Sequence, residues 1–244
     1  MIIKDVWLMH SGGALLQTLS HKYAGEVQLF TSFLSAFNSI VANMRGSLSS
    51  VVISEVKFSF ASRGELIYIL LSTTDIPSSY TTYVVNFIAD RYHKIAGNKE
   101  FIGDTSLYND FDDIAQQALR DSGILFLNSA LQLFESAQDI HCVCLVEMKE
   151  KRPLILKIRK DIDEDLIQRL SNVFRMTAPA RFLIAVKKEY YIISGTPEWG
   201  IVLVMNPLER YVMSTRLNLL KNNMPEATPA PTHEEVKLIE DWRA

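Results

Sequence analysis

The predicted strands and helices follow the same order twice along the chain, and this doubling limits the possible folds more than any other feature of the sequence. Each half contains two strands, a helix, three strands and a second helix. The helices of the first half are expected at residues 27–45 and 78–95, and those of the second half at 162–176 and 208–222. We therefore expect an α/β protein of the α+β type, with two antiparallel sheets of about five strands and helices packed against each sheet.

The spacing of apolar residues supports both kinds of element. In the first predicted helix they recur every three or four positions: Val27, Phe30, Leu34, Phe37, Val41 and Met44. Such a stripe is typical of a helix that lies on a sheet. From 56 to 60, apolar residues alternate with Lys57 and Ser59. This alternation predicts a strand with one buried face and one face in solvent.

The length of the chain and one polar stretch predict the domain organisation. A chain of 244 residues can hold one large domain or two of about 100 to 120 residues. The polar, glycine-containing stretch 97–110 is the best internal boundary, and a helical stretch at 124–137 follows it. We expect a first domain over residues 1–121, a second over 122–224, and a proline-rich linker with a short tail over 225–244.

The composition is that of an ordinary globular protein that can bury hydrophobic cores. Hydrophobic residues make up 48% of the chain, charged residues make up 22%, and the net charge is −3. Nucleic acid is not expected as a partner, because phosphate neutralisation needs a concentrated basic face. The main basic group, Lys149–Arg152 with Lys157, Arg159 and Lys160, surrounds a predicted hairpin. It is interpreted either as a solvated hairpin or as a surface for an anionic partner.

No targeting or membrane-spanning segment is expected. Lys4 and Asp5 interrupt the N-terminus before an apolar run can form, unlike the start of a signal peptide. A membrane helix needs roughly 20 apolar residues, and the richest stretch, 124–134, is interrupted by polar residues. We expect a cytoplasmic protein whose association with membranes, if any, is peripheral or indirect.

The two cysteines are expected to serve core packing. Cys142 and Cys144 lie two positions apart in a predicted strand, so their side chains share a face. A disulfide between them would be strained, and a zinc site would need a second pair of ligands that the sequence does not offer. A redox or metal-binding role is the alternative.

Two patterns imitate ligand-binding loops but lack the residues that bind. Residues 195–200 have the glycine spacing of a phosphate loop, yet Ile201 and Val202 replace its Lys and Ser or Thr. A turn between two strands is expected there instead. Acidic residues at 161–165 imitate the start of a calcium loop, but Leu166 replaces the glycine of its sharp turn. We expect no catalytic residues, no cofactor and no metal site.

The first half of the chain resembles a longin domain. The resemblance covers residues 2–97 and includes the opening from Ile3 to Gly13, its glycine hairpin turn and the helix that follows. The second half, from about 124 to 222, resembles a roadblock domain, a relative that begins with a helix; a second longin domain fits almost as well. In this pairing the chain is similar to archaeal relatives of eukaryotic trafficking proteins and small-GTPase regulators.

The resemblance implies a non-enzymatic scaffold or regulator that binds a small Ras-like GTPase. Such domains commonly pair through a helix and an edge strand, which implies self-association or a complex with a second longin or roadblock protein. Some relatives supply an arginine finger to the GTPase, and Arg63, in a predicted turn, is the candidate here. The alternative functions are a membrane-trafficking adaptor or SNARE-like module with a fold-back segment, and a cryptic enzyme or ligand sensor.

The C-terminal tail has the pattern of a short docking helix. Prolines between 225 and 231 predict a spacer. Beyond them Val236, Ile239 and Trp242 recur every three residues and would form one apolar edge of a helix. We expect these three residues to bind a partner or the protein itself; the alternative is a frayed tail. An isolated helix of this length is marginal in water, so the segment would be ordered only when docked.

Overall fold

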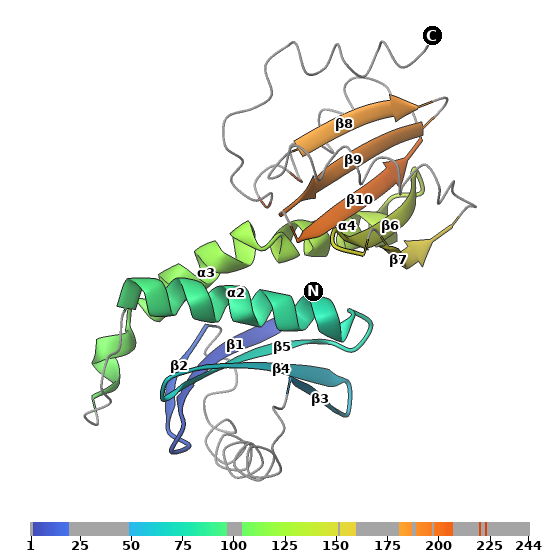
Figure 1. Ribbon diagram of the computed structural model, residues 1–244. Helices are drawn as coiled ribbons and strands as arrows, with labels where there is room; N and C mark the ends of the chain where they lie inside the picture. Colours follow the sequence, from blue (N-terminus) through green and yellow to red (C-terminus); the bar gives the residue numbers. More distant parts are fainter. Residues whose placement is uncertain are drawn as a thin grey trace. The chain divides into compact units, whose positions relative to one another are not determined.

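A computed structural model shows two compact units, Met1–Leu119 and Arg120–Ala244 (Figure 1). The structure describes residues 2–19, 49–96, 104–150, 152–159, 181–186, 189–196 and 198–206, together with Leu220 and Asn223. The helices expected at 27–45 and 162–176, the acidic pattern at 161–165 and the C-terminal tail lie outside the described residues. The same holds for the helix expected at 208–222, apart from Leu220.

The first unit contains an antiparallel sheet of five strands. The strands are β1 (Ile3–His10), β2 (Leu15–Thr18), β3 (Ser50–Ile53), β4 (Val56–Arg63) and β5 (Leu66–Thr73). They lie side by side in the order β2-β1-β5-β4-β3. The first strand of the chain therefore pairs with the second and the fifth, and β2 and β3 form the two edges.

The second unit contains another antiparallel sheet of five strands. The strands are β6 (Ile140–Glu147), β7 (Arg152–Ile158), β8 (Arg181–Val186), β9 (Glu189–Gly195) and β10 (Trp199–Met205). Their order is β7-β6-β10-β9-β8. Counted within its own unit, each strand occupies the same position as its counterpart in the first sheet. The predicted fold class, two antiparallel sheets with packed helices, is confirmed.

The described helices agree with the sequence pattern. They are α2 (Ser78–Ala96), the short 3₁₀ helix η1 (Thr105–Tyr108), α3 (Phe111–Asp121) and α4 (Ile124–Ser136). Helix α2 begins directly after Pro77, whose carbonyl oxygen accepts hydrogen bonds from the amides of Tyr80 and Thr81. Pro is favoured just at a helix start because its missing N–H has no partner there anyway. The division between the compact units falls within α3, two residues before the expected division at 121/122.

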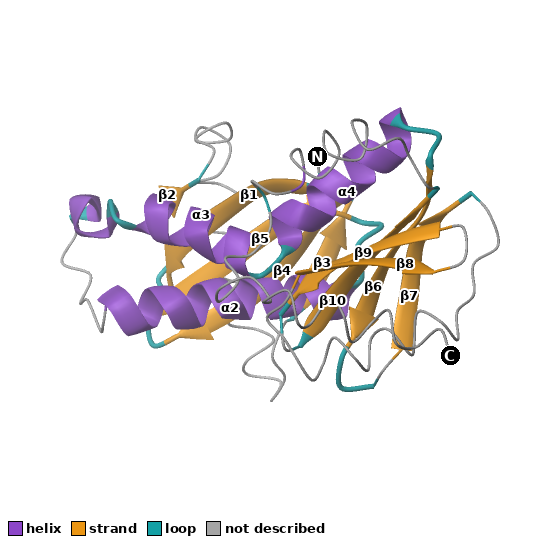
Figure 2. Cartoon of the chain, turned by 90° about the horizontal axis from the view of Figure 1, so that it is seen from above, coloured by secondary structure: helices purple, strands orange, loops and turns teal. Residues whose placement is uncertain are grey.

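Both faces of the first sheet are buried. Helix α2 contacts β4 and β5 on one face, as Figures 1 and 2 show. The opposite face carries a cluster of large buried side chains: Trp7, Met9, Phe58, Phe60, Ile67, Ile69 and Leu71. Continuous burial along β5 (Leu66–Thr73) follows from its position at the centre of the sheet, where a strand has neighbours on both sides.

The expectation that Lys57 and Ser59 face solvent is wrong. Lys57 is 4% exposed and Ser59 is fully buried. Their side of β4 is covered by α2, and the Ser59 hydroxyl donates to Oγ1 of Thr81 on that helix at 2.7 Å. The Lys57 ammonium donates to the carbonyl oxygens of Thr74, at 3.2 Å, and of Ile76 in the loop before α2. A polar residue on an alternating strand can thus be buried if its hydrogen-bonding groups find partners.

The turn between β1 and β2 has the tight geometry expected from its glycines. The amide of His10 donates to the carbonyl of Ala14 at 2.8 Å, and the amide of Gly13 donates to the carbonyl of His10 at 2.9 Å. Gly13 has φ of 93°, a left-handed conformation that other residues seldom adopt. The amide of Ser11 donates to the carbonyl of Glu65 at 2.7 Å, which ties this turn to the β4–β5 turn.

Candidate interaction surfaces

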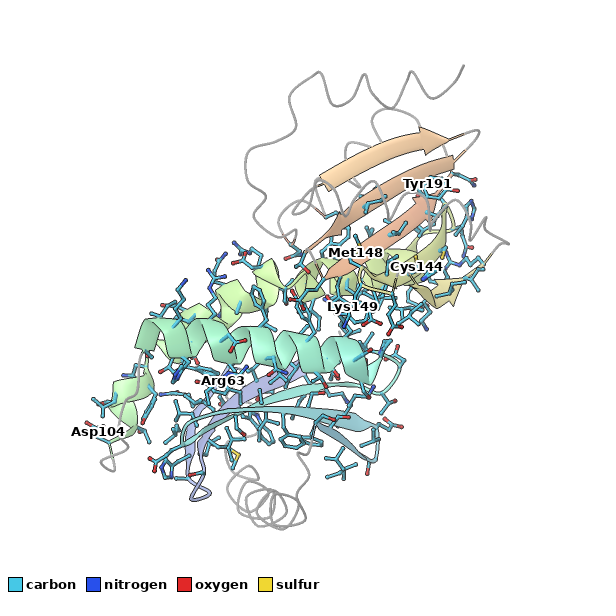
Figure 3. All side chains as sticks on the ribbon, in the orientation of Figure 1. Arg63, Asp104, Cys144, Met148, Lys149 and Tyr191 are labelled. Atoms are coloured by element: carbon cyan, nitrogen blue, oxygen red, sulfur yellow. The ribbon has the colours of Figure 1, made fainter. Side chains whose placement is uncertain are left out.

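Arg63, the candidate arginine finger, is the last residue of β4, and its side chain lies against α2 (Figure 3). Its Nε donates to Oδ1 of Asp90 at 2.6 Å, and one terminal nitrogen donates to Oδ1 of Asn86 at 3.0 Å. The other terminal nitrogen donates to the carbonyl of Ser62 at 2.8 Å. The side chain is 28% exposed. These contacts hold the guanidinium along the sheet–helix junction, so reaching a partner would require breaking the pair with Asp90.

The two hairpin turns at the same end of the sheet are joined through a histidine. Nε2 of His10 lies 3.2 Å from Oε2 of Glu65, and Nδ1 of His10 accepts a hydrogen bond from the amide of Gly12 at 3.0 Å. Because Nδ1 accepts, the proton of the neutral ring resides on Nε2 and is donated to the carboxylate. The histidine therefore fixes the relative position of both turns, which the sequence alone did not indicate.

A buried aromatic cluster packs between α2, β5 and the segment that leads into α3. The Tyr92 ring meets the Phe111 ring edge to face at a centroid distance of 5.2 Å, and Tyr68 lies 6.1 Å from Tyr92. The Tyr92 hydroxyl donates to Oδ1 of Asp110 at 3.0 Å. The Tyr68 hydroxyl is buried and has no hydrogen-bond partner among the described residues. The cluster therefore holds one satisfied and one unsatisfied hydroxyl.

Burial changes the ionisation of these tyrosines. Loss of hydration raises the pKa of Tyr68 above its ordinary value, and the nearby Arg63 only partly offsets this. Loss of hydration also raises the pKa of Tyr92, with a further increase from its hydrogen bond to Asp110. The pKa of Tyr108 is also raised, by burial and by the charge of Glu65. All three phenols therefore stay neutral wherever this unit is folded at physiological pH.

Two basic side chains of the hairpin in the second unit make contacts within the fold. Nζ of Lys157 lies 3.5 Å from a carboxylate oxygen of Glu135 on α4. The guanidinium of Arg159 donates to the carbonyl oxygens of Phe134, Ala137 and Ile140, the last at 3.2 Å, and lies 4.1 Å from the centre of the Phe134 ring. Arg159 thus satisfies carbonyls at the C-terminal end of α4. This use supports the structural interpretation of the basic group over an anionic partner surface.

The phosphate-loop lookalike is a turn between β9 and β10, as expected. The Thr196 hydroxyl accepts hydrogen bonds from the amides of Glu198, at 3.3 Å, and Trp199, at 3.1 Å. The amide of Thr196 donates to the carbonyl of Trp199 at 2.8 Å. The amide groups that a phosphate would require from residues 198 and 199 are therefore used by the turn itself.

The remaining sequence-predicted sites are in the core or outside the described residues. Cys142 and Cys144 form no disulfide and are fully buried on β6, which agrees with core packing. In the part of the chain that the structure describes, no group of three His, Cys, Asp or Glu residues is arranged to hold a metal ion. The tail residues Val236, Ile239 and Trp242 lie outside that part, so their docking role stays a prediction.

Three of the five large apolar side chains that are exposed in the described part of the chain lie on two edge strands. Val52 on β3 is 53% exposed, and on β7 Ile155 and Ile158 are 36% and 48% exposed. Edge strands offer unpaired backbone N–H and C=O groups, so apolar side chains there favour pairing with another strand. These positions were not singled out in the sequence, because strand order decides which strand is an edge.

Comparison with known proteins gives no assignment: no protein-family model matches the chain, and no curated protein is significantly similar to it. Among the helices within the described segments, none has both the length and the apolar character needed to cross a membrane.

Proposed function

We propose that this protein is a non-enzymatic scaffold or regulator of the longin/roadblock type that binds a small Ras-like GTPase, as a dimer or in a hetero-complex. The observation that supports the proposal best is the strand order, which is the same in both units. Each unit is an open antiparallel sheet with helices, and such a sheet presents edge strands to a partner. We place the protein in the cytoplasm, where its association with membranes would be peripheral or indirect.

The surroundings of Arg63 favour a scaffold over a GTPase-activating protein. An arginine finger must enter the partner's nucleotide site, where it accelerates hydrolysis by about 10³- to 10⁵-fold. The guanidinium of Arg63 instead makes three contacts within its own unit, to Asp90, Asn86 and Ser62. These contacts give Arg63 a structural role that needs no partner, and the scaffold is the function that we propose.

The test measures binding and hydrolysis separately. Candidate Ras-like GTPases that co-purify with the protein would be loaded with GDP or a GTP analogue and titrated against the full chain by calorimetry. The proposal predicts saturable binding that depends on the bound nucleotide, and no increase in GTP hydrolysis beyond what the GTPase shows alone. Absence of binding in both nucleotide states would contradict the proposal.

Arg63→Lys separates the two roles of the arginine. This substitution keeps the charge but loses the planar fork that contacts Asp90 and Asn86 together. For a scaffold, we expect lower thermal stability and unchanged hydrolysis by the bound GTPase. A loss of stimulated hydrolysis with unchanged binding would instead identify Arg63 as an arginine finger.

A further inference from the structure

The two sheets agree in register as well as in strand order. In each sheet the first and last strands of the chain order pair in register except for one extra residue, which is Lys4 in β1 and His141 in β6. In both cases it is the second residue of its strand. The pairings of the other strands align residues 50–72 with residues 183–205 without a gap. The two sheets can therefore be compared position by position.

The turns at one end of each sheet are held by the same backbone contact. In the first unit the amide of Ser11 donates to the carbonyl of Glu65 at 2.7 Å, and in the second the amide of Met148 donates to the carbonyl of Glu198 at 2.9 Å. Glu65 and Glu198 occupy corresponding positions in their turns. The two sheets thus present nearly the same backbone to a helix, so side chains must decide which helix packs on which sheet.

Polar side chains join the first sheet to α2. The Ser59 hydroxyl donates to Oγ1 of Thr81 at 2.7 Å, and the Thr81 hydroxyl donates to the carbonyl of Ser78 at 3.2 Å. The Lys57 ammonium donates to two carbonyl oxygens in the loop that leads into α2. Lys57, Ser59 and Thr81 are all buried, and we refer to these three residues as the α2 polar contacts.

The second sheet has other residue types at the corresponding positions. Lys57 aligns with Tyr190, and Ser59 aligns with Ile192. Ser59 is fully buried and Ile192 is 1% exposed. The same buried position is therefore filled by a serine in one unit and by an isoleucine in the other.

Stability alone does not account for the α2 polar contacts. Replacing both partners of a buried hydrogen bond by apolar groups of the same shape is often nearly neutral or stabilising. Burial also disfavours the charged form of an amine, and it lowers the pKa of Lys57. What polar groups add is a penalty for a wrong partner, because a buried polar group that loses its partner keeps the full cost of its desolvation.

We propose that the α2 polar contacts confine α2 to the first sheet and so prevent helices from exchanging between two sheets of similar backbone. Any other helix placed on β4 would bury the Lys57 ammonium and the Ser59 hydroxyl without their partners. In turn, α2 placed on the second sheet would bury the Thr81 hydroxyl against Ile192. Each group left unsatisfied disfavours the wrong pairing by about 5- to 150-fold.

Such a device suits a chain with two sheets of the same design. Misassembly between domains and exchange of elements between copies are characteristic failures of multidomain and repeat proteins. In some proteins a buried polar group is retained because it specifies one arrangement at a cost in stability. This role goes beyond the proposed function and does not depend on GTPase binding.

The first test removes the α2 polar contacts. Lys57→Met, Ser59→Ala and Thr81→Val together replace them with apolar side chains of similar volume, and the full chain is then refolded from denaturant. In hydrogen exchange followed by mass spectrometry, peptides of α2 should show a second isotopic envelope. Its population should rise at least about fivefold over the wild type, because one unsatisfied group already supplies that factor. Size-exclusion chromatography with light scattering should show an additional species in which two chains have exchanged α2.

The matched control changes the opposite face of the same sheet. Ile69→Val with Leu71→Val introduces the residues that the second sheet has at these positions, Val202 and Val204. The loss of buried methylene groups should lower the melting temperature, but peptides of α2 should keep a single envelope. A less stable control with one placement of α2 would separate specificity from stability.

A pair of cysteines reports which chain supplies α2. Oγ of Ser59 and Oγ1 of Thr81 are 2.7 Å apart, so Ser59→Cys with Thr81→Cys should form a disulfide within one chain when α2 lies on its own sheet. Adding Lys57→Met should increase the share of disulfides between chains, which appear as covalent dimers in a denaturing gel without reductant. Cys142 and Cys144 are fully buried and do not compete.

Three results would overturn the inference: a triple variant that refolds to one species with a single α2 envelope, a control variant that gains the second envelope as well, or disulfides between chains that Lys57→Met does not increase. If the triple variant does not fold, Ser59→Ala with Thr81→Val, which keeps Lys57, is judged by the same two measurements. A chain that binds no GTPase would contradict the proposed function and leave this inference standing.

Discussion

Replacing each of two neighbouring buried tyrosines by phenylalanine tests whether their hydroxyl groups stabilise the first unit. Tyr68 and Tyr92 are both fully buried, and their rings are 6.1 Å apart. Each substitution removes one oxygen atom and keeps the aromatic packing. The difference in stability between the two variants therefore reports on the hydroxyl groups. The Tyr92 hydroxyl donates to Asp110 at 3.0 Å, whereas the Tyr68 hydroxyl has no partner among the described residues.

The expected changes in unfolding free energy have opposite directions. A hydrogen bond to a charged group contributes about 1.5 to 3 kcal/mol, so Tyr92→Phe should destabilise the unit by about 1.5 kcal/mol, near the lower end because Asp110 is exposed to solvent. An unsatisfied buried hydroxyl costs about 1 to 3 kcal/mol. Tyr68→Phe removes that cost and should be neutral or stabilise by about 1 kcal/mol. By calorimetry the two melting temperatures should differ by about 6 to 10 °C.

The same variants make a prediction about alkaline pH. The pKa of each phenol is raised in the folded state by burial, so unfolded chains lose these protons first, near pH 10. The unfolded state then binds fewer protons than the folded state, and stability falls as the pH rises above about 10. Either substitution should reduce this fall.

If Tyr68→Phe destabilises the unit as much as Tyr92→Phe at neutral pH, then the Tyr68 hydroxyl is satisfied and the reasoning is refuted.

Three further substitutions have expected outcomes. Burial lowers the pKa of Lys57 in the folded state, so at alkaline pH the unfolded state binds more protons than the folded state. The contribution of this group to the free energy of unfolding therefore rises with pH, and Lys57→Met should abolish that rise in denaturant titrations. Gly64 has φ of 59° and open space around it, so Gly64→Ala should cost about 1 kcal/mol from backbone strain alone, and Gly64→Asn less. Arg159→Leu leaves the carbonyls of Phe134 and Ala137 without this donor, and hydrogen exchange should become faster at the end of α4.

The periodic signals in the sequence were sufficient for most of the described elements but not for the faces of the strands. Helix α2 and helix α4 were expected at 78–95 and 124–137 and are found at Ser78–Ala96 and Ile124–Ser136. The alternation around Lys57 was read as one face in solvent, yet α2 covers that face. Alternation shows that two faces differ in polarity; it does not show whether a helix from a later part of the chain covers the polar one.

The candidate sites depended on contacts between residues far apart in the sequence. Arg63 was expected in a turn and lies beside one, but its ion pair with Asp90 joins positions 27 residues apart. The hydrogen bond from Tyr92 to Asp110 spans 18 residues. The exposure of Val52 depends on strand order, which places β3 outside β4. None of these relations leaves a periodic pattern, because each is created by the tertiary fold.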